Sequence, residues 1–156
     1  MITRGVIGIA LLISLFILAG CATNSLNLAE RAEAYDAYIV EKKLEKLDRI
    51  TTFRFDGWAD LGEQHLIIST NVNRMYLLTF KNKCFDLHHS QAIKINQTGS
   101  VLQTKFDSIE VVDDFPMRCF IDGIYKISRE QRRELIAIGR DKESTEEDVA
   151  KAETAD

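Results

Sequence analysis

The chain of 156 residues contains a single proline, Pro116, and its eight glycines are scattered along the sequence. No glycine-rich loop is present to hold a phosphate, and no G-x-S-x-G frame surrounds any serine. Basic residues (20) are fewer than acidic ones (24), and they form no stripe. This balance argues against nucleic acid as a partner. No internal repeat is visible either, so a repeat architecture is not expected.

One apolar run occurs at the start of the chain, from Gly5 to Gly20, after the single charged residue Arg4. It is shorter than the roughly 20 residues that a membrane-spanning helix needs, and its layout is that of a secretory signal peptide. Leu18-Ala19-Gly20-Cys21 resembles the bacterial lipobox, in which the cysteine thiol receives a diacylglyceryl group and becomes the new N-terminus. We therefore expect residues 1–20 to be a lipoprotein signal peptide and Cys21 to be lipidated. The alternative is a retained anchor helix with an incidental cysteine.

The residues that flank this segment indicate where the protein would be held. Two or three acyl chains on one cysteine give an anchor that rarely dissociates, whereas one chain holds only reversibly. Ala22 follows the cysteine, and not the aspartate that commonly retains similar lipoproteins at the inner membrane. We expect an outer-membrane lipoprotein that faces the periplasm, with residues 21–26 as a lipidated tether and the membrane as a partner through the lipid. From residue 139 to 156 the chain has three basic and seven acidic residues, which predicts an acidic and mostly disordered tail.

Two cysteines, Cys84 and Cys119, are left once Cys21 is set aside. An even pair in an oxidising compartment predicts a disulfide, with two reduced and buried thiols as the alternative. A bridge closing a loop of about 35 residues would stabilise the fold by about 4 kcal/mol. A redox role is not expected, because the pair lacks the C-x-x-C spacing.

The segment 27–138 reads as one α+β domain. Residues 27–48 are rich in Ala, Glu, Lys and Leu with apolar residues at helical spacing, which predicts a helix. Later segments show two-residue periodicity or short apolar runs, and predict about six strands with hairpin connections. These strand segments are 51–58, 65–70 paired with 74–80, 92–96 paired with 101–112, and 118–127. Ser128 and Gln131 form a capping box that opens a short second helix, which Gly139 would end.

These elements predict an antiparallel, possibly curled sheet with one face covered by the first helix. Cys119 would lie on one face of the last strand with Ile121, Gly123, Tyr125 and Ile127. The aromatic residues on alternating strand positions are expected in the core. They are Trp58, Tyr76, Phe80, Phe106 and Tyr125.

The sequence contains no catalytic, cofactor or metal residues that can be assigned. His88 and His89 would point to opposite faces of a strand, and a metal would need a third ligand such as His65. Asp113-Asp114 is typical of a turn. The available serines lie in no recognisable nucleophile frame; they include Ser69, Ser90, Ser100 and Ser108.

The stretch from Trp58 to Ile127 resembles a family of small proteobacterial lipoproteins of unknown function. The resemblance depends on Tyr76-Leu77-Leu78, on Cys84 with Leu87, on Phe106-Asp107-Ser108-Ile109 and on Cys119-Phe120-Ile121 leading to Ile124. That family has no assigned activity, so the resemblance implies only the paired cysteines and the β-rich body.

Three possible functions follow from these patterns. The first is a non-enzymatic envelope lipoprotein that binds a protein or another envelope component, without a cofactor. The second is a periplasmic small-ligand-binding protein or enzyme with a pocket at the end of the sheet, near Trp58, His65 or His88. An open concave pocket would favour a small ligand, and a flat apolar strip would favour a protein partner. A third possibility is metal handling through His88 and His89.

Overall fold

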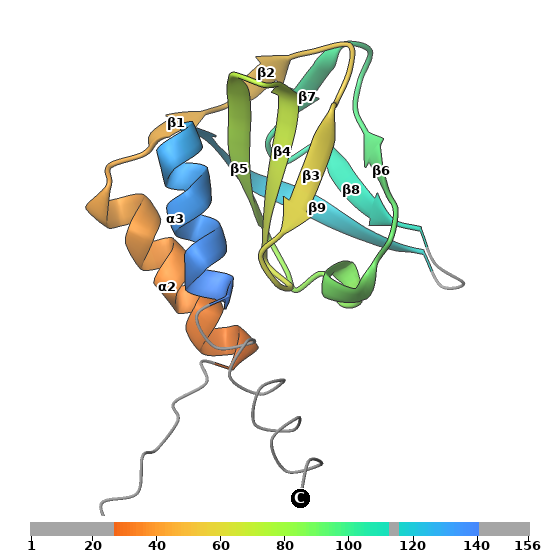
Figure 1. Cartoon of the computed structure of the whole chain (residues 1–156). Coiled ribbons are helices and arrows are strands. Elements are labelled where there is room, and N and C mark those ends of the chain that lie inside the picture. The colour runs from red at the N-terminus through yellow and green to blue at the C-terminus, as the bar shows by residue number, and fades with distance from the viewer. Residues whose placement is uncertain (1–26, 113–115, 141–156) are drawn as a thin grey trace, which may run out of the picture.

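The computed structural model describes residues 27–112 and 116–140. Two helices, nine strands and one short 3-10 helix follow one another in this part of the chain (Figure 1). The predicted signal peptide, Cys21, the tether, Asp113-Asp114 and the chain after Arg140 lie outside the described residues. None of the described helices has the length and apolar character needed to cross a membrane. In chain order the elements are α2 (Leu28–Glu41), β1 (Glu45–Leu47), β2 (Arg49–Thr51), β3 (Gly57–Asp60), β4 (His65–Asn71), β5 (Arg74–Phe80), η1 (Leu87–His89), β6 (Ile93–Asn96), β7 (Val101–Gln103), β8 (Ser108–Val111), β9 (Met117–Ile127) and α3 (Arg129–Arg140).

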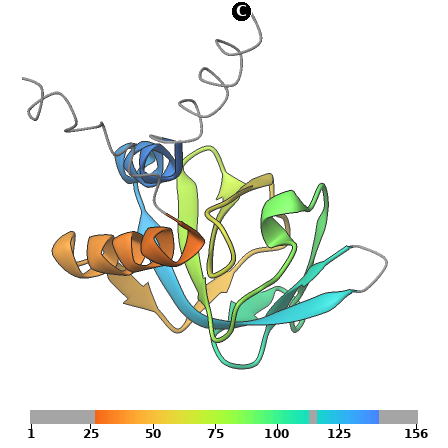
Figure 2. The same cartoon turned by 90° about the horizontal axis from the view of Figure 1, so that it is seen from below.

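The main sheet has the strand order β3-β4-β5-β9-β8-β6, and every neighbouring pair is antiparallel. The short strand β1 also pairs with β9, and β2 pairs with β7 as a separate ribbon. Seen from below, the sheet curls into a half-barrel, with α2 and α3 side by side on its outer side (Figure 2). The fold is α+β with a curled antiparallel sheet, as the sequence predicted.

Two hydrophobic clusters hold this architecture together. The inner cluster fills the curve of the half-barrel and includes Leu66, Leu78, Ile109 and Ile121, together with Cys84 and Cys119. The outer cluster lies between the sheet and the two helices. Its buried members are Tyr35, Tyr38, Leu61, Ile67, Met75, Leu77, Ile127 and Leu135. The sheet therefore buries apolar side chains on both faces, and the first predicted helix shares the outer face with the second.

The Cys84 and Cys119 sulfur atoms form a disulfide, with Cα atoms 5.5 Å apart. The bond joins the segment after β5 to β9 inside the inner cluster, as the cysteine count predicted.

Strand β9 does not keep the single alternating face that the sequence indicated. Its pairing with β5 shifts register between Thr79 and Phe80, where Thr79 pairs with Gly123 and Phe80 pairs with Ile121. The extra residue of this bulge reverses the alternation. Cys119, Ile121 and Ile124 therefore face the inner cluster, whereas Tyr125 and Ile127 face the helices.

The first helix is shorter than predicted. Asn27 caps α2 with a full capping box to Glu30, and the helix ends at Glu41. Lys43 then has a φ of 48°, a left-handed conformation that ends helices. The chain continues from Glu45 as strand β1 on β9, so the predicted helix 27–48 is wrong over its last turns.

Two strand predictions also need correction. Residues 52–56, predicted as part of one strand, form a connection between β2 and β3, and the Phe53 side chain there is 89% exposed. The predicted strand 101–112 is divided by a turn into β7 and β8. β6 pairs with β8, as predicted for this run, whereas β7 pairs with β2 across the end of the half-barrel. The hairpin of 65–70 with 74–80 is confirmed as β4–β5.

The capping box at Ser128 is confirmed, but Gly139 does not end the second helix. The Ser128 backbone N–H donates to Gln131 Oε1 at 2.8 Å, and the Gln131 N–H donates to Ser128 Oγ at 3.1 Å. Helix α3 continues to Arg140. A Cβ at Gly139 would lie 2.9 Å from the Tyr35 hydroxyl oxygen, so this glycine allows α3 to approach α2 closely.

Candidate functional site

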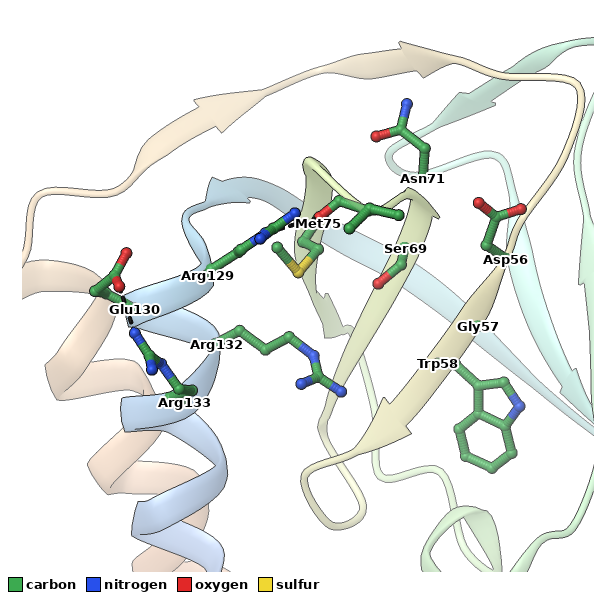
Figure 3. A pocket seen from close by; sticks show the side chains of 11 residues that line it. Asp56, Gly57, Trp58, Ser69, Asn71, Met75, Arg129, Glu130, Arg132 and Arg133 are labelled. Atoms are coloured by element: carbon green, nitrogen blue, oxygen red, sulfur yellow. Dashed lines mark hydrogen bonds and ion pairs between the residues drawn. The ribbon is translucent and has the colours of Figure 1, made fainter.

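A pocket of about 590 Å³ lies between α3 and the outer face of β3 and β4 (Figure 3). The first turns of α3 supply Arg129, Arg132 and Arg133 to one wall. The opposite wall is made by the start of β3 and the end of β4, where Gly57 and Ser69 pair directly across the two strands. The capping box at Ser128 fixes the start of α3 beside these two strand ends. The three arginines in the first two turns of the helix therefore all reach this pocket.

The three arginines differ in the hydrogen-bond and ion-pair partners that their guanidinium groups already have. Arg129 donates from Nε to the Val72 carbonyl at 3.2 Å and from Nη2 to Asn73 Oδ1 at 2.8 Å. Arg133 is paired with Glu130 on its own helix. The half-buried Arg132 has no side-chain hydrogen bond or ion pair to any residue that the structure describes, and its guanidinium projects toward the sheet.

The acidic residues of this pocket are already neutralised. Asp56 Oδ1 lies 3.0 Å from Arg54 Nε, and Glu130 is paired with Arg133. The Ser69 hydroxyl also faces the space in front of α3 (Figure 3). Arg132 and Ser69 therefore offer hydrogen-bond donors, while the nearby carboxylates are occupied. A planar guanidinium beside a hydroxyl is suited to a carboxylate, phosphate or sulfate group.

A second, smaller pocket of about 290 Å³ lies at the other end of β3. Helix α2 contributes Arg31 and Tyr35, β3 contributes Asp60, and η1 contributes His88. Arg132 lines this pocket as well as the larger one. The two pockets therefore follow the same edge strand and share one arginine.

Tyr35 is 1% exposed, and its hydroxyl has no hydrogen-bond partner among the described residues. Burial raises the pKa of Tyr35 to about 12; Arg31 acts against this shift and Asp60 adds to it. The phenol therefore stays protonated over the whole physiological range and is available as a donor at the pocket wall.

The three histidines occupy different environments. His88 Nδ1 lies 2.8 Å from Asp60 Oδ1, so the ring is fixed at the wall of the smaller pocket. His89 is exposed beside it, with the two ring centroids 5.1 Å apart. In the described part of the chain, no group of three His, Cys, Asp or Glu side chains has the arrangement of a metal site.

His65 lies in neither pocket. Its ring is 2% exposed, and its Nε2 lies 3.0 Å from Asp36 Oδ1, which ties α2 to β4. Burial lowers the pKa of His65 from the ordinary value of 6.5, although Asp36 opposes this shift. A neutral ring that donates from Nε2 to Asp36 fits this environment and serves the packing of α2.

Of the residues that the sequence singled out, Trp58 and His88 each line a pocket, but not the same one. Trp58 is half-buried and packs against the inner cluster, and its ring points away from the arginines (Figure 3). Ser69 lines the larger pocket. Phe106, expected in the core, is 78% exposed.

Sequence reasoning missed the residues that define both pockets. Arg31, Tyr35, Asp60, Arg129 and Arg132 come from three separate elements. The one available signal was the spacing of Arg129, Arg132 and Arg133, which places three cations on neighbouring positions of one helix.

The fold and the two pockets define a small α+β domain with a curled sheet and an arginine-lined groove under its last helix. A family model described as a family of unknown function, DUF6491, matches residues 3–143, and the chain belongs to that family. No curated protein and no solved structure matches the chain.

Proposed function

We propose that this protein is a lipoprotein of the bacterial envelope, anchored through Cys21 in the outer membrane and facing the periplasm. The Leu18-Ala19-Gly20-Cys21 segment supports this proposal, as does the resemblance to small proteobacterial lipoproteins. The Cys84–Cys119 disulfide is consistent with an oxidising compartment. In this proposal residues 1–20 are removed and the domain is held by the short tether of residues 21–26.

Intact mass spectrometry of the native protein tests the anchor. We expect a chain that begins at Cys21 and carries the added mass of its acyl chains, because the thiol is the site of lipid transfer. A Cys21→Ser variant should keep residues 1–20 and gain no lipid. As a matched control, Ala22→Asp should be lipidated normally and collect in the inner-membrane fraction. A native protein with an intact Met1 terminus and no lipid mass would contradict the anchor.

We further propose that the domain acts without catalysis, by binding an anionic group of an envelope component in the larger pocket. Arg132 carries this proposal, because its guanidinium lines the pocket without a partner among the described residues. An unpaired cation at a half-buried site is incompletely compensated, and a bound anion would restore the compensation. Asp56 and Glu130 do not compete for it, since each already has an arginine partner.

A binding role fits the lining better than hydrolysis does. A serine nucleophile needs an adjacent base, and the described lining around Ser69 includes no histidine. His88 lies in the smaller pocket, where Asp60 fixes its ring. A protein partner, the other form of a binding role, would use a surface outside the pockets. Phe53 and Phe106 are the most exposed aromatic side chains there among the described residues.

Titration of the full-length chain in non-ionic detergent with inorganic phosphate and with acetate tests the pocket. We expect saturable shifts of the Arg132 side-chain and Ser69 amide NMR signals, with both anions in competition. Arg132→Gln should weaken binding about tenfold, the loss expected when a hydrogen bond to a charged group is removed.

Arg49→Gln is the matched control, because Arg49 is exposed on β2 and lines neither pocket. It should leave the anion affinity unchanged. Equal binding by Arg132→Gln and the unaltered chain would reject the pocket as the site.

A further inference from the structure

The two pockets are joined through Arg132 along the outer face of β3. Gly57 contributes to the larger pocket, and Ala59 and Asp60 contribute to the smaller one. A strand advances about 3.3 Å per residue, so the parts of the two pockets at Gly57 and Asp60 are separated by about 10 Å along β3. The outer face of β3 carries only small side chains where the two pockets meet. Gly57 has open space where a Cβ would be, and Ala59 is the next residue on that face.

The smaller pocket has its own unpaired donors. The Tyr35 side chain is 1% exposed and lines this pocket, and its hydroxyl has no hydrogen-bond partner among the described residues. Arg31 lines the same pocket and has no ion pair with another described residue. The carboxylate of Asp60 is directed to His88 Nδ1 at 2.8 Å, so part of its hydrogen-bonding capacity is already used.

We propose that the two pockets form one elongated site for a molecule with an acidic group at each end, one group held by Arg132 with Ser69 and the other by Arg31 with the Tyr35 hydroxyl. Arg132 lines both pockets and lies between the two groups. The neutral spacer of the ligand lies along β3 over Gly57 and Ala59. This inference rests on the proposed function, since the first acidic group occupies the larger pocket.

Linear dicarboxylates of increasing length measure the separation between the two acid-binding parts of this site. The series succinate, adipate, suberate, sebacate and dodecanedioate is titrated into the full-length chain in non-ionic detergent, with hexanoate and octanoate as monoacids. We expect the tightest binding near suberate and sebacate, whose extended carboxylates are separated by about the distance between the pockets. Joining two weakly bound groups through a spacer of matched length should tighten binding at least about tenfold over the monoacids.

Variants separate the two halves of the site. Arg31→Gln should remove the advantage of the long diacids and leave acetate and octanoate binding unchanged, because Arg31 lines only the smaller pocket. Tyr35→Phe should act in the same direction, and thermal melting checks that both variants stay folded. Arg132→Gln should weaken monoacids and diacids alike.

The outcomes distinguish this inference from the function on which it rests. If monoacids bind and need Arg132, but diacids of every length bind no more tightly, the elongated site is wrong and the single anion pocket stands. If neither monoacids nor diacids bind, the proposed function itself fails. A length optimum that survives in Arg31→Gln would also overturn the inference, because the second group would then be held elsewhere.

Discussion

Removing the Cys84–Cys119 disulfide will lower the free energy of unfolding by about 4 kcal/mol, one of the two largest effects that we expect for this protein. The bridge closes a segment with a sequence separation of 35, which contains β6, β7 and β8. In the chain-entropy model a loop of this length restricts the unfolded chain by that amount. A domain of this size typically has only about 5–15 kcal/mol of stability, so the reduced form would be marginal.

Urea unfolding of the Cys84→Ala/Cys119→Ala double variant measures this loss. Alanine is preferable to serine, because both positions are buried in the inner cluster and a hydroxyl there would have no partner. The unaltered chain unfolded in a reducing agent is the matched control, since it lacks the bridge but keeps the sulfur atoms. The variant and the reduced chain should agree within about 1 kcal/mol. A reduced chain as stable as the oxidised one would show that the bridge does not hold the half-barrel together.

The main features of this fold could be predicted from local patterns. The β4–β5 hairpin has two apolar runs separated by a short polar turn, and the second helix has Ser128 and Gln131 at capping-box spacing. Both depend on residues close in sequence, whose physical preferences are readable without the tertiary structure. The disulfide could be predicted because one pair of cysteines remains once Cys21 is set aside as the expected lipidation site.

The predictions that were wrong depend on pairing between distant segments. The Glu-Lys-Leu sequence of β1 favours a helix by local preference. It forms a strand because Lys43 ends the helix in a left-handed conformation and β9 then pairs with the segment. β7 pairs with β2, which lies about 50 residues earlier, and not with its neighbour β6. The bulge in β9 adds one residue against β5, and this reverses which side chains face the inner cluster. No local period encodes such a shift.

The pockets also depend on packing between distant segments, which local sequence patterns do not predict. Arg132 has the sequence environment of a solvated helix face, because the residues around it are charged. It lines a pocket only because α3 packs on β4 and β5 through the outer cluster and leaves the outer face of β3 beside it. The functional groups of the groove thus depend on the docking of α3, and not on the inner cluster.

Replacing Leu135 by alanine will therefore test the structural support of the groove, and we expect it to lower the free energy of unfolding by about 3 kcal/mol. Leu135 is fully buried on α3, in the outer cluster with Tyr35, Ile67 and Leu77. A leucine-to-alanine change at such a site removes transfer free energy and leaves a cavity, which together cost about 2–5 kcal/mol. Leu28→Ala is the control: Leu28 is 40% exposed at the start of α2, and its loss should cost less than about 1 kcal/mol.

Hydrogen exchange shows which part of the molecule depends on Leu135. The disulfide lies in the inner cluster and Leu135 in the outer one, so α3 amides should exchange faster in Leu135→Ala while β8 amides keep their protection until global unfolding. Anion binding through Arg132 should weaken in parallel with the loss of α3 protection, because the helix must dock to place the guanidinium in the pocket. Equal acceleration in α3 and β8 would mean that the two clusters unfold as one unit. The groove would then have no separate stability, and the link between α3 docking and binding would be lost.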